Sequence, residues 1–226
     1  MLYTNIQPGV FLDRPNRFVA HVEINGHIEL CHVKNTGRCR ELLVPGTRVY
    51  LERSDKPERR TKYDLIAVEK GTRLINMDSQ APNHVFGEYL QTGRYIPSPD
   101  LIRPETRYGS SRFDFYAESE NKRIFLEVKG VTLEIGGHAF FPDAPTERGV
   151  KHLHELIAAL KDGYEAHAVF VIQMKDVHCF SPNRQTHPAF ADALIAASAA
   201  GVKLCALNCS VTPDSLHILG RIPIEL

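Results

Sequence analysis

Alternation of apolar and polar residues is the main pattern over residues 1–80. This period-two pattern is typical of strands that have one face in a core and the other in solvent. It runs over residues 18–24 and 28–33, and the Asn25-Gly26 pair between them is a favoured hairpin turn. Two further strands are expected at residues 47–52 and 63–69. The first part of the chain is therefore predicted to be β structure.

A turn leading into a short helix is expected over residues 35–43, between these pairs of strands. Several short strands with one brief helix are typical of a small closed barrel of the OB type. Barrels of this type commonly bind single-stranded nucleic acid. We predict an OB-like, nucleic-acid-binding domain over residues 1–80, with residues 70–82 as the crossing to a second domain.

Helical periodicity and continuous apolar runs alternate over residues 81–226. Apolar runs of this kind are typical of strands buried on both faces. Residues 132–145, which contain several glycines and prolines, are expected to form a long exposed loop. The pattern predicts an α/β domain with a mixed central sheet. Its expected elements are a helix from an Asn83 cap to Gly93, strands at 102–108, 112–116 and 124–129, a helix from a Thr146 cap to about 162, a strand at 168–173, a helix at 188–200 and a strand at 202–207.

Candidate chemistry lies on two of these strands. Alternation places Glu127 and Lys129 on one face of the strand at 124–129. The polar segment 117–123 has the composition of a hairpin loop, which would bring Asp114 beside Glu127. Paired carboxylates hold a hard cation such as Mg²⁺ or Mn²⁺, and a neighbouring lysine can orient or deprotonate a water molecule. The alternative interpretation is a surface hairpin with an ordinary Glu-Lys ion pair.

Two helices carry further candidate residues. Glu88 either reaches the metal site as a third ligand or is a plain surface glutamate. Arg148, Lys151 and His152 share one face at the start of the helix that follows Thr146. A helix N-terminus attracts anions, so this face suits a phosphate group, although it could equally be a solvated helix face.

The charge balance restricts how nucleic acid could be bound. The chain has 27 Lys and Arg residues against 27 Asp and Glu residues, so binding must depend on local basic patches. Such patches are expected at Arg38 and Arg40, and at Arg59 and Arg60 in the loop over residues 53–62. The alternative is a solvated charged loop.

Targeting patterns and cysteine usage favour a cytoplasmic protein. The first residues lack a basic flank followed by an apolar core, and no run approaches about 18 apolar residues. No membrane association is therefore expected. Five cysteines is an odd number, which favours reduced thiols. The pattern leaves the oligomeric state open.

Three motifs resemble a known family. The order helix, three strands, helix, strand, with Asp on the second strand and Glu-x-Lys on the third, resembles the PD-(D/E)xK, or restriction-endonuclease-like, nuclease superfamily. Phe113 stands where the superfamily name has proline. More specifically, the chain resembles the sugar fermentation stimulation protein A family over nearly its whole length. The motifs that carry this likeness are Ser111-Arg-Phe-Asp114, Leu126-Glu-Val-Lys-Gly-Val-Thr-Leu133 and Phe141-Pro-Asp-Ala-Pro-Thr-Glu-Arg-Gly-Val-Lys-His-Leu153, together with Pro8-Gly9 and Asn35-Thr36-Gly37.

The resemblance implies an OB-like domain followed by a nuclease-like domain, in a cytoplasmic protein that binds DNA without sequence preference. It implies that Asp114 and Glu127 are metal ligands, that Lys129 is the catalytic lysine and that Glu88 is an added helix carboxylate. It also implies a regulatory link to maltose and sugar metabolism.

Two interpretations of function remain open. The first is a Mg²⁺-dependent deoxyribonuclease, and the second is a DNA-binding regulator without turnover. The joint presence of Asp114, Glu127 and Lys129 favours the first, because a pure phosphate binder gains nothing from carboxylates near the anion. A sugar-binding enzyme has less support, since the chain has no tryptophan to stack on a sugar ring.

Overall fold

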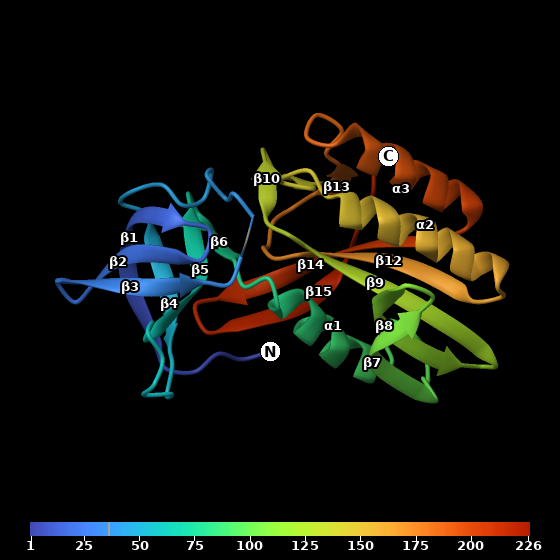
Figure 1. The fold of residues 1–226 in the computed structure, drawn as a ribbon, viewed down its shortest axis with the longest axis horizontal. Helices are drawn as coiled ribbons and strands as arrows, with labels where there is room; N and C mark the ends of the chain where they lie inside the picture. The colour runs from blue at the N-terminus through green and yellow to red at the C-terminus, as the bar shows by residue number, and fades with distance from the viewer. Residues whose placement is uncertain (36) are drawn as a thin grey trace.

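The computed structural model describes residues 1–35 and 37–226 and divides them between a barrel and an α/β domain, shown at left and right in Figure 1. The predicted turn at Asn35-Thr36-Gly37 includes Thr36, which lies outside the described residues. Within the described part of the chain, no helix is long and apolar enough to cross a membrane.

The first domain is a closed barrel. Its sheet has the order β3-β2-β1-β4-β5-β6, and β3 also pairs with β5, which closes the sheet on itself. The Asn25-Gly26 turn joins β2 to β3 as predicted. The OB-like fold expected from the sequence is therefore confirmed. The strands are β1 (Ile6–Asn16), β2 (Val19–Ile24), β3 (His27–Val33), β4 (Arg48–Arg53), β5 (Tyr63–Lys70) and β6 (Arg73–Asn76).

Two details of the barrel differ from the sequence prediction. The described residues of segment 35–43 form a turn at residues 40–42, and the expected short helix is absent from them. Strand β1 was missed because Pro8 and Gly9 weaken its strand pattern. Gly9 is required by packing, since a Cβ there would lie 2.6 Å from Cγ1 of Val22 on β2.

The second domain is built on a mixed sheet with the order β15-β14-β12-β9-β8-β7. The three strands β9, β12 and β14 are parallel, and the outer strands pair antiparallel. Helix α1 covers one face, and α2 and α3 cover the other (Figure 1). The predicted α/β class is confirmed. The elements are α1 (Ala81–Gln91), β7 (Leu101–Tyr108), β8 (Ser111–Ser119), β9 (Lys122–Val131), β10 (Leu133–Ile135), β11 (His138–Phe141), α2 (Glu147–Lys161), β12 (Glu165–Ile172), β13 (Cys179–Pro182), α3 (Pro188–Ala200), β14 (Lys203–Thr212) and β15 (Ser215–Ile222).

The segment expected to be a long exposed loop, 132–145, is instead largely ordered. It contains the hairpin β10–β11, which joins β13 in a small three-stranded sheet. Buried Glu134 anchors this hairpin to the barrel, because its carboxylate accepts hydrogen bonds from Lys70 at 2.9 Å and Arg73 at 3.0 Å. The glycines and prolines of the segment therefore mark tight turns within an ordered region.

A buried polar network joins the two domains where β6 leads to α1. The side-chain amide of Gln173 donates to Oδ1 of Asn76 at 2.9 Å and to the carbonyl of Asp78 at 3.0 Å. The Asp78 carboxylate in turn accepts from Lys34 of the barrel at 3.1 Å. Helix α1 begins earlier than expected, with Gln80 as its N-cap in place of Asn83.

Candidate metal and nucleic-acid site

Alternation along β9 places the candidate residues as predicted. Leu126 and Val128 pack into the core beneath α1, while Phe125 packs into the core beneath α2 and α3. Glu127 faces α2, and its side chain contacts Lys129 and His152. A central strand of the sheet therefore carries a carboxylate into the interface with α2.

Asp114 lies where β8 and β9 separate. Regular pairing of the two strands ends at Phe115 opposite Leu126, and the next free N–H of β9, that of Val128, donates to Oδ2 of Asp114 at 2.7 Å. Oδ1 accepts from the side chain of Asn83 on α1 at 2.8 Å. Burial, followed by the nearby charge of Glu127, raises the pKa of Asp114. The hairpin thus brings the two carboxyl groups together, and Asn83 holds one of them in place.

Glu127 is almost completely buried, with 3% of its surface exposed. Its Oε1 accepts hydrogen bonds from Lys129 Nζ and His152 Nδ1, whereas Oε2 is buried without a hydrogen-bond partner among the described residues. Burial alone would raise the pKa of Glu127, but Lys129 and His152 outweigh it and hold the pKa below its ordinary value. Glu127 is therefore an ionised carboxylate with one unused oxygen.

His152 does not lie on the open helix face that the sequence indicated. It is 4% exposed, its Nδ1 binds Glu127, and its Nε2 accepts from Arg148 at 3.3 Å. The buried side of α2 includes Gly149 and Leu156 as well as His152, a spacing of three and four residues that could have revealed this position. Its direct partner is therefore the carboxylate of Glu127.

Gly130 allows β9 to pass close to its neighbours just after Lys129. A Cβ at this position would lie 2.5 Å from Oε1 of Gln173 and 2.6 Å from Cγ of Pro82. Any other residue would push β9 away from α1. The glycine after the Glu-x-Lys motif thus allows β9 to lie close to α1 immediately after Lys129.

A basic hollow of about 360 Å³ lies beside this pair of carboxylates. Arg148 and Lys151 of α2, both predicted from the sequence, line it with His152. Arg107 and Arg112, from β7 and β8, complete it and were not predicted. They were missed because β7 and β8 meet α2 only in the folded chain.

Arg107 and Arg148 make no ion pair among the residues that the structure describes. Arg112 pairs with Glu105 at 3.0 Å, and Lys151 lies 3.7 Å from Glu155. The hollow therefore keeps a net positive charge, which favours an anionic ligand such as a phosphate group.

A second basic surface lies on the barrel. The exposed side chains of Arg38 and Arg40 line a hollow of about 380 Å³ together with Arg17 and with Ala144 of the second domain. A neighbouring hollow of about 410 Å³ shares Arg17 and Ala144 and extends to Gly130. The barrel surface therefore leads to the end of β9 that carries Lys129.

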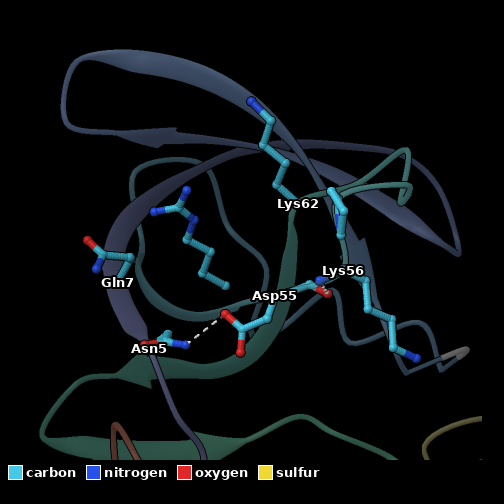
Figure 2. A pocket seen from close by; sticks show the side chains of 8 residues that line it. Asn5, Gln7, Asp55, Lys56 and Lys62 are labelled. Carbon is cyan, nitrogen blue, oxygen red and sulfur yellow. Dashed lines mark hydrogen bonds between the residues drawn. The ribbon is translucent and has the colours of Figure 1, made fainter.

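The two predicted basic residues in the loop over residues 53–62 have different environments. Arg60 is exposed, but Arg59 is bound to the buried carboxylate of Asp64 at 2.6 and 3.0 Å. A hollow of about 610 Å³ lies beside this loop, where Lys56 and Lys62 extend away from each other (Figure 2). Every residue that lines it belongs to the barrel, so it lies apart from the carboxylate pair.

Glu88 is not brought to Asp114 and Glu127. Its carboxylate, 45% exposed, contacts the ammonium of Met1 at 2.5 Å and lies 3.4 Å from His84. The Met1 ammonium also donates to Leu216 of β15, so Glu88 lies on the side of α1 that faces β15. Its prediction as a metal ligand is not supported, and Asn83 is the α1 residue that contacts Asp114.

Comparisons with known proteins agree with this architecture. The family described as Sugar fermentation stimulation protein RE domain matches residues 80–215, and the SfsA N-terminal OB domain matches residues 12–77. A sugar fermentation stimulation protein homolog of Desulfitobacterium hafniense strain Y51 is 60% identical over 226 residues, which is 100% of this chain and 99% of the relative. This chain belongs to the sugar fermentation stimulation protein family.

Other members of the family are similar over their full length. The homolog of Ruminiclostridium cellulolyticum is 54% identical and matches over 100% of both chains. The structure of Pyrococcus furiosus SfsA in complex with Ca²⁺ is similar with a TM-score of 0.90 and 31% identity, over 100% of this chain and 98% of that one. The two-domain arrangement is therefore that of the SfsA family.

Proposed function

We propose that this chain binds DNA through the phosphate backbone and cleaves phosphodiester bonds at the site formed by Asp114, Glu127 and Lys129, with Mg²⁺ or Mn²⁺ as cofactor. The observation that carries the proposal is the Oε2 atom of Glu127, which is buried without a partner among the described residues. A buried, ionised carboxylate oxygen is costly unless something binds it. A divalent cation meets that requirement.

The residues fit a hard cation that takes oxygen ligands. Glu127 offers a free oxygen, and each oxygen of Asp114 accepts a single hydrogen bond, which leaves a lone pair on each. The Ca²⁺ in the structure of Pyrococcus furiosus SfsA supports this assignment, since Ca²⁺ and Mg²⁺ both prefer oxygen ligands. When bound, the cation would stabilise negative charge on the phosphate and lower the pKa of a bound water.

The surrounding side chains supply the other requirements of the reaction. Lys129, whose ammonium contacts Glu127, would orient the attacking water, and the contact with His152 would hold Glu127 in one orientation. Arg107 and Arg148 would bind the phosphate beside the scissile bond, because their charges are unpaired within the described chain. Each of these roles uses a contact or a charge that is in place before substrate binds.

The substrate proposed is DNA recognised without regard to sequence. Arg38 and Arg40 on the barrel and the hollow beside α2 offer charge to phosphates on two sides of the carboxylate pair. Charge of this kind positions a backbone but does not distinguish bases. Affinity should therefore fall steeply as salt concentration rises and change little with base sequence.

Cleavage of end-labelled single-stranded, double-stranded and flap DNA in Mg²⁺, Mn²⁺ or EDTA tests the proposal. We expect metal-dependent cutting that falls about 100-fold or more in Glu127→Gln and Lys129→Ala. DNA affinity measured in Ca²⁺ should remain within a few-fold of the wild type, because neither residue supplies the main phosphate contacts.

Glu88→Gln is the matched control for these variants. It removes the charge of a glutamate that contacts Met1 and not the carboxylate pair, so cleavage should persist. DNA binding without cutting on every substrate would reject catalysis and favour a DNA-binding regulator. Absence of both binding and cutting would reject the proposal altogether.

A further inference from the structure

Strands β11 and β13 and the segment that follows β15 lie side by side in the second domain. Strand β11 pairs in parallel with β13, and His138 lies directly opposite Cys179 in this register. On its other side, β13 is bridged in parallel by the segment that follows β15, through Phe180 opposite Ile224. These strands bring together side chains that are up to 87 residues apart, the difference between 225 and 138.

The register places one imidazole, one thiol and one carboxylate on the same face. Phe180 is buried and Ile224 packs against the same core, so both point inward. Side chains alternate along a strand, so Cys179 and Glu225 point to the opposite face. His138 shares that face because it is the register partner of Cys179.

Backbone hydrogen bonds hold the third strand in this position. The N–H of Phe180 donates to the carbonyl of Pro223, and the N–H of Glu225 donates to the carbonyl of Phe180, both at 2.9 Å. As a result, a ring nitrogen of His138, Sγ of Cys179 and a carboxylate oxygen of Glu225 all lie within 4.8 Å of one another.

We propose that His138, Cys179 and Glu225 form a second metal site, which binds Zn²⁺ with an open fourth position. Imidazole, thiolate and carboxylate are the ligand types of protein zinc sites, and sites with three protein ligands leave one position for water or another ligand. The thiolate distinguishes this site from the oxygen-lined pair at Asp114 and Glu127, because Mg²⁺ and Ca²⁺ disfavour sulfur. The two sites therefore select different metals.

The surroundings of His138 fit this assignment. Nε2 of His138 lies 3.0 Å from Oγ of Ser181, and the ring stacks on Phe140 with centroids 4.4 Å apart. Outer contacts of this kind fix the orientation of a histidine ligand.

Titration of metal-free, full-length protein with Co²⁺ tests the site, because cobalt bound to a thiolate absorbs in the near ultraviolet. We expect a saturable band with one Co²⁺ per chain that Zn²⁺ displaces and excess Mg²⁺ does not. Cys179→Ser should abolish the band, and Glu225→Gln should weaken cobalt binding about 10-fold or more. Asp114→Asn, in the other site, should leave the band unchanged.

Thermal unfolding provides a second measurement that does not depend on the cobalt–thiolate absorption band. Zn²⁺ should raise the melting temperature of the wild type and of Asp114→Asn but not that of Cys179→Ser. A cobalt band that survives in Cys179→Ser, or the absence of any band in folded wild-type protein, would overturn the assignment. The test is independent of DNA cleavage, so either proposal can fail without the other.

Discussion

Arg59 and Arg60 are neighbours in the sequence but have different environments. Arg59 donates two hydrogen bonds to Asp64, a carboxylate that is 6% exposed and also contacts His32. Burial alone would raise the pKa of Asp64, yet Arg59 and His32 lower it below its usual value. Arg59 is therefore a structural partner of a buried charge, whereas Arg60 is exposed to solvent.

This difference predicts that alanine substitutions at Arg59 and Arg60 change different properties of the protein. Arg59→Ala should lower the free energy of unfolding by about 2 to 3 kcal/mol, because it leaves Asp64 buried without its main partner. Arg60→Ala should change that free energy by less than about 0.5 kcal/mol and weaken DNA binding at low salt. Urea unfolding and DNA titration of both variants measure this, and equal destabilisation by the two would contradict it.

Residue patterns predicted the carboxylate pair better than its surroundings. Alternation along β9 was enough to orient Glu127 and Lys129, because strand geometry is local. The contacts of His152 and Asn83 depend on how α2 and α1 pack on the sheet, so the sequence could not show them. The sequence left Glu88 open between the metal site and the surface for the same reason, since its contact with Met1 joins residues that are 87 positions apart.

At the scale of elements, the helices and the strands β7, β9 and β12 were predicted more fully than β13 and β15. Helix α3 has the predicted bounds, and Thr146 caps α2 as expected, its side chain accepting from the N–H of Gly149. Strand β13 was missed because it has only four residues, and β15 because it is a half-exposed edge strand. Short or half-exposed strands carry a weak pattern, so their pairing depends on neighbours elsewhere in the chain.

The first residue of β12, Glu165, forms ion pairs with lysines on both neighbouring strands. Glu165 accepts from Lys203 of β14 at 2.5 Å and lies 3.2 Å from Lys122 of β9. The bond from Lys203 is the main reason that the pKa of Glu165 falls from 4.5 to about 2. Because the folded-state pKa is lowered, this carboxylate stabilises the fold above its unfolded pKa and loses that effect as pH falls towards the folded pKa.

Glu165→Gln should therefore destabilise the protein in a pH-dependent way. At neutral pH the free energy of unfolding should fall by about 1 kcal/mol, and the difference from wild type should shrink as pH falls from about 5 to 3. Glu120→Gln is the control, since Glu120 is exposed and makes no ion pair within the described chain. Urea unfolding across this pH range measures the effect, and a difference independent of pH would contradict the explanation.

At the scale of the whole molecule, Glu134 is the main charged link between the barrel and the small three-stranded sheet. It is 2% exposed at the side chain and pairs with Lys70 and Arg73, which lie on β5 and β6. The N–H of Gly137 also donates to it. Loss of this carboxylate would remove ion pairs across the domain boundary while leaving both cores intact.

Glu134→Gln should therefore loosen the connection between the domains more than either domain itself. We expect faster hydrogen exchange over residues 132–141 and a broader unfolding transition, in which the domains unfold in separate steps. Hydrogen exchange and urea unfolding followed by two probes measure this. A single transition with an unchanged midpoint would show that the polar network around Gln173 is sufficient to couple the domains.

The pairing of Leu2 and Tyr3 with the β14–β15 turn has a consequence for the order in which the protein is completed during synthesis. Leu2 bridges Ser215, and the N–H of Tyr3 donates to the carbonyl of Asp214 at 2.8 Å. The barrel strands can close once residue 76 has left the ribosome, since all of them lie before it. The backbones of Leu2 and Tyr3, however, have no partner in the β14–β15 turn until residues 214 and 215 have been made. The nascent protein can therefore hold Tyr3 against the barrel, through Asn76 and Ile66, long before the backbone of its leading segment joins the second domain.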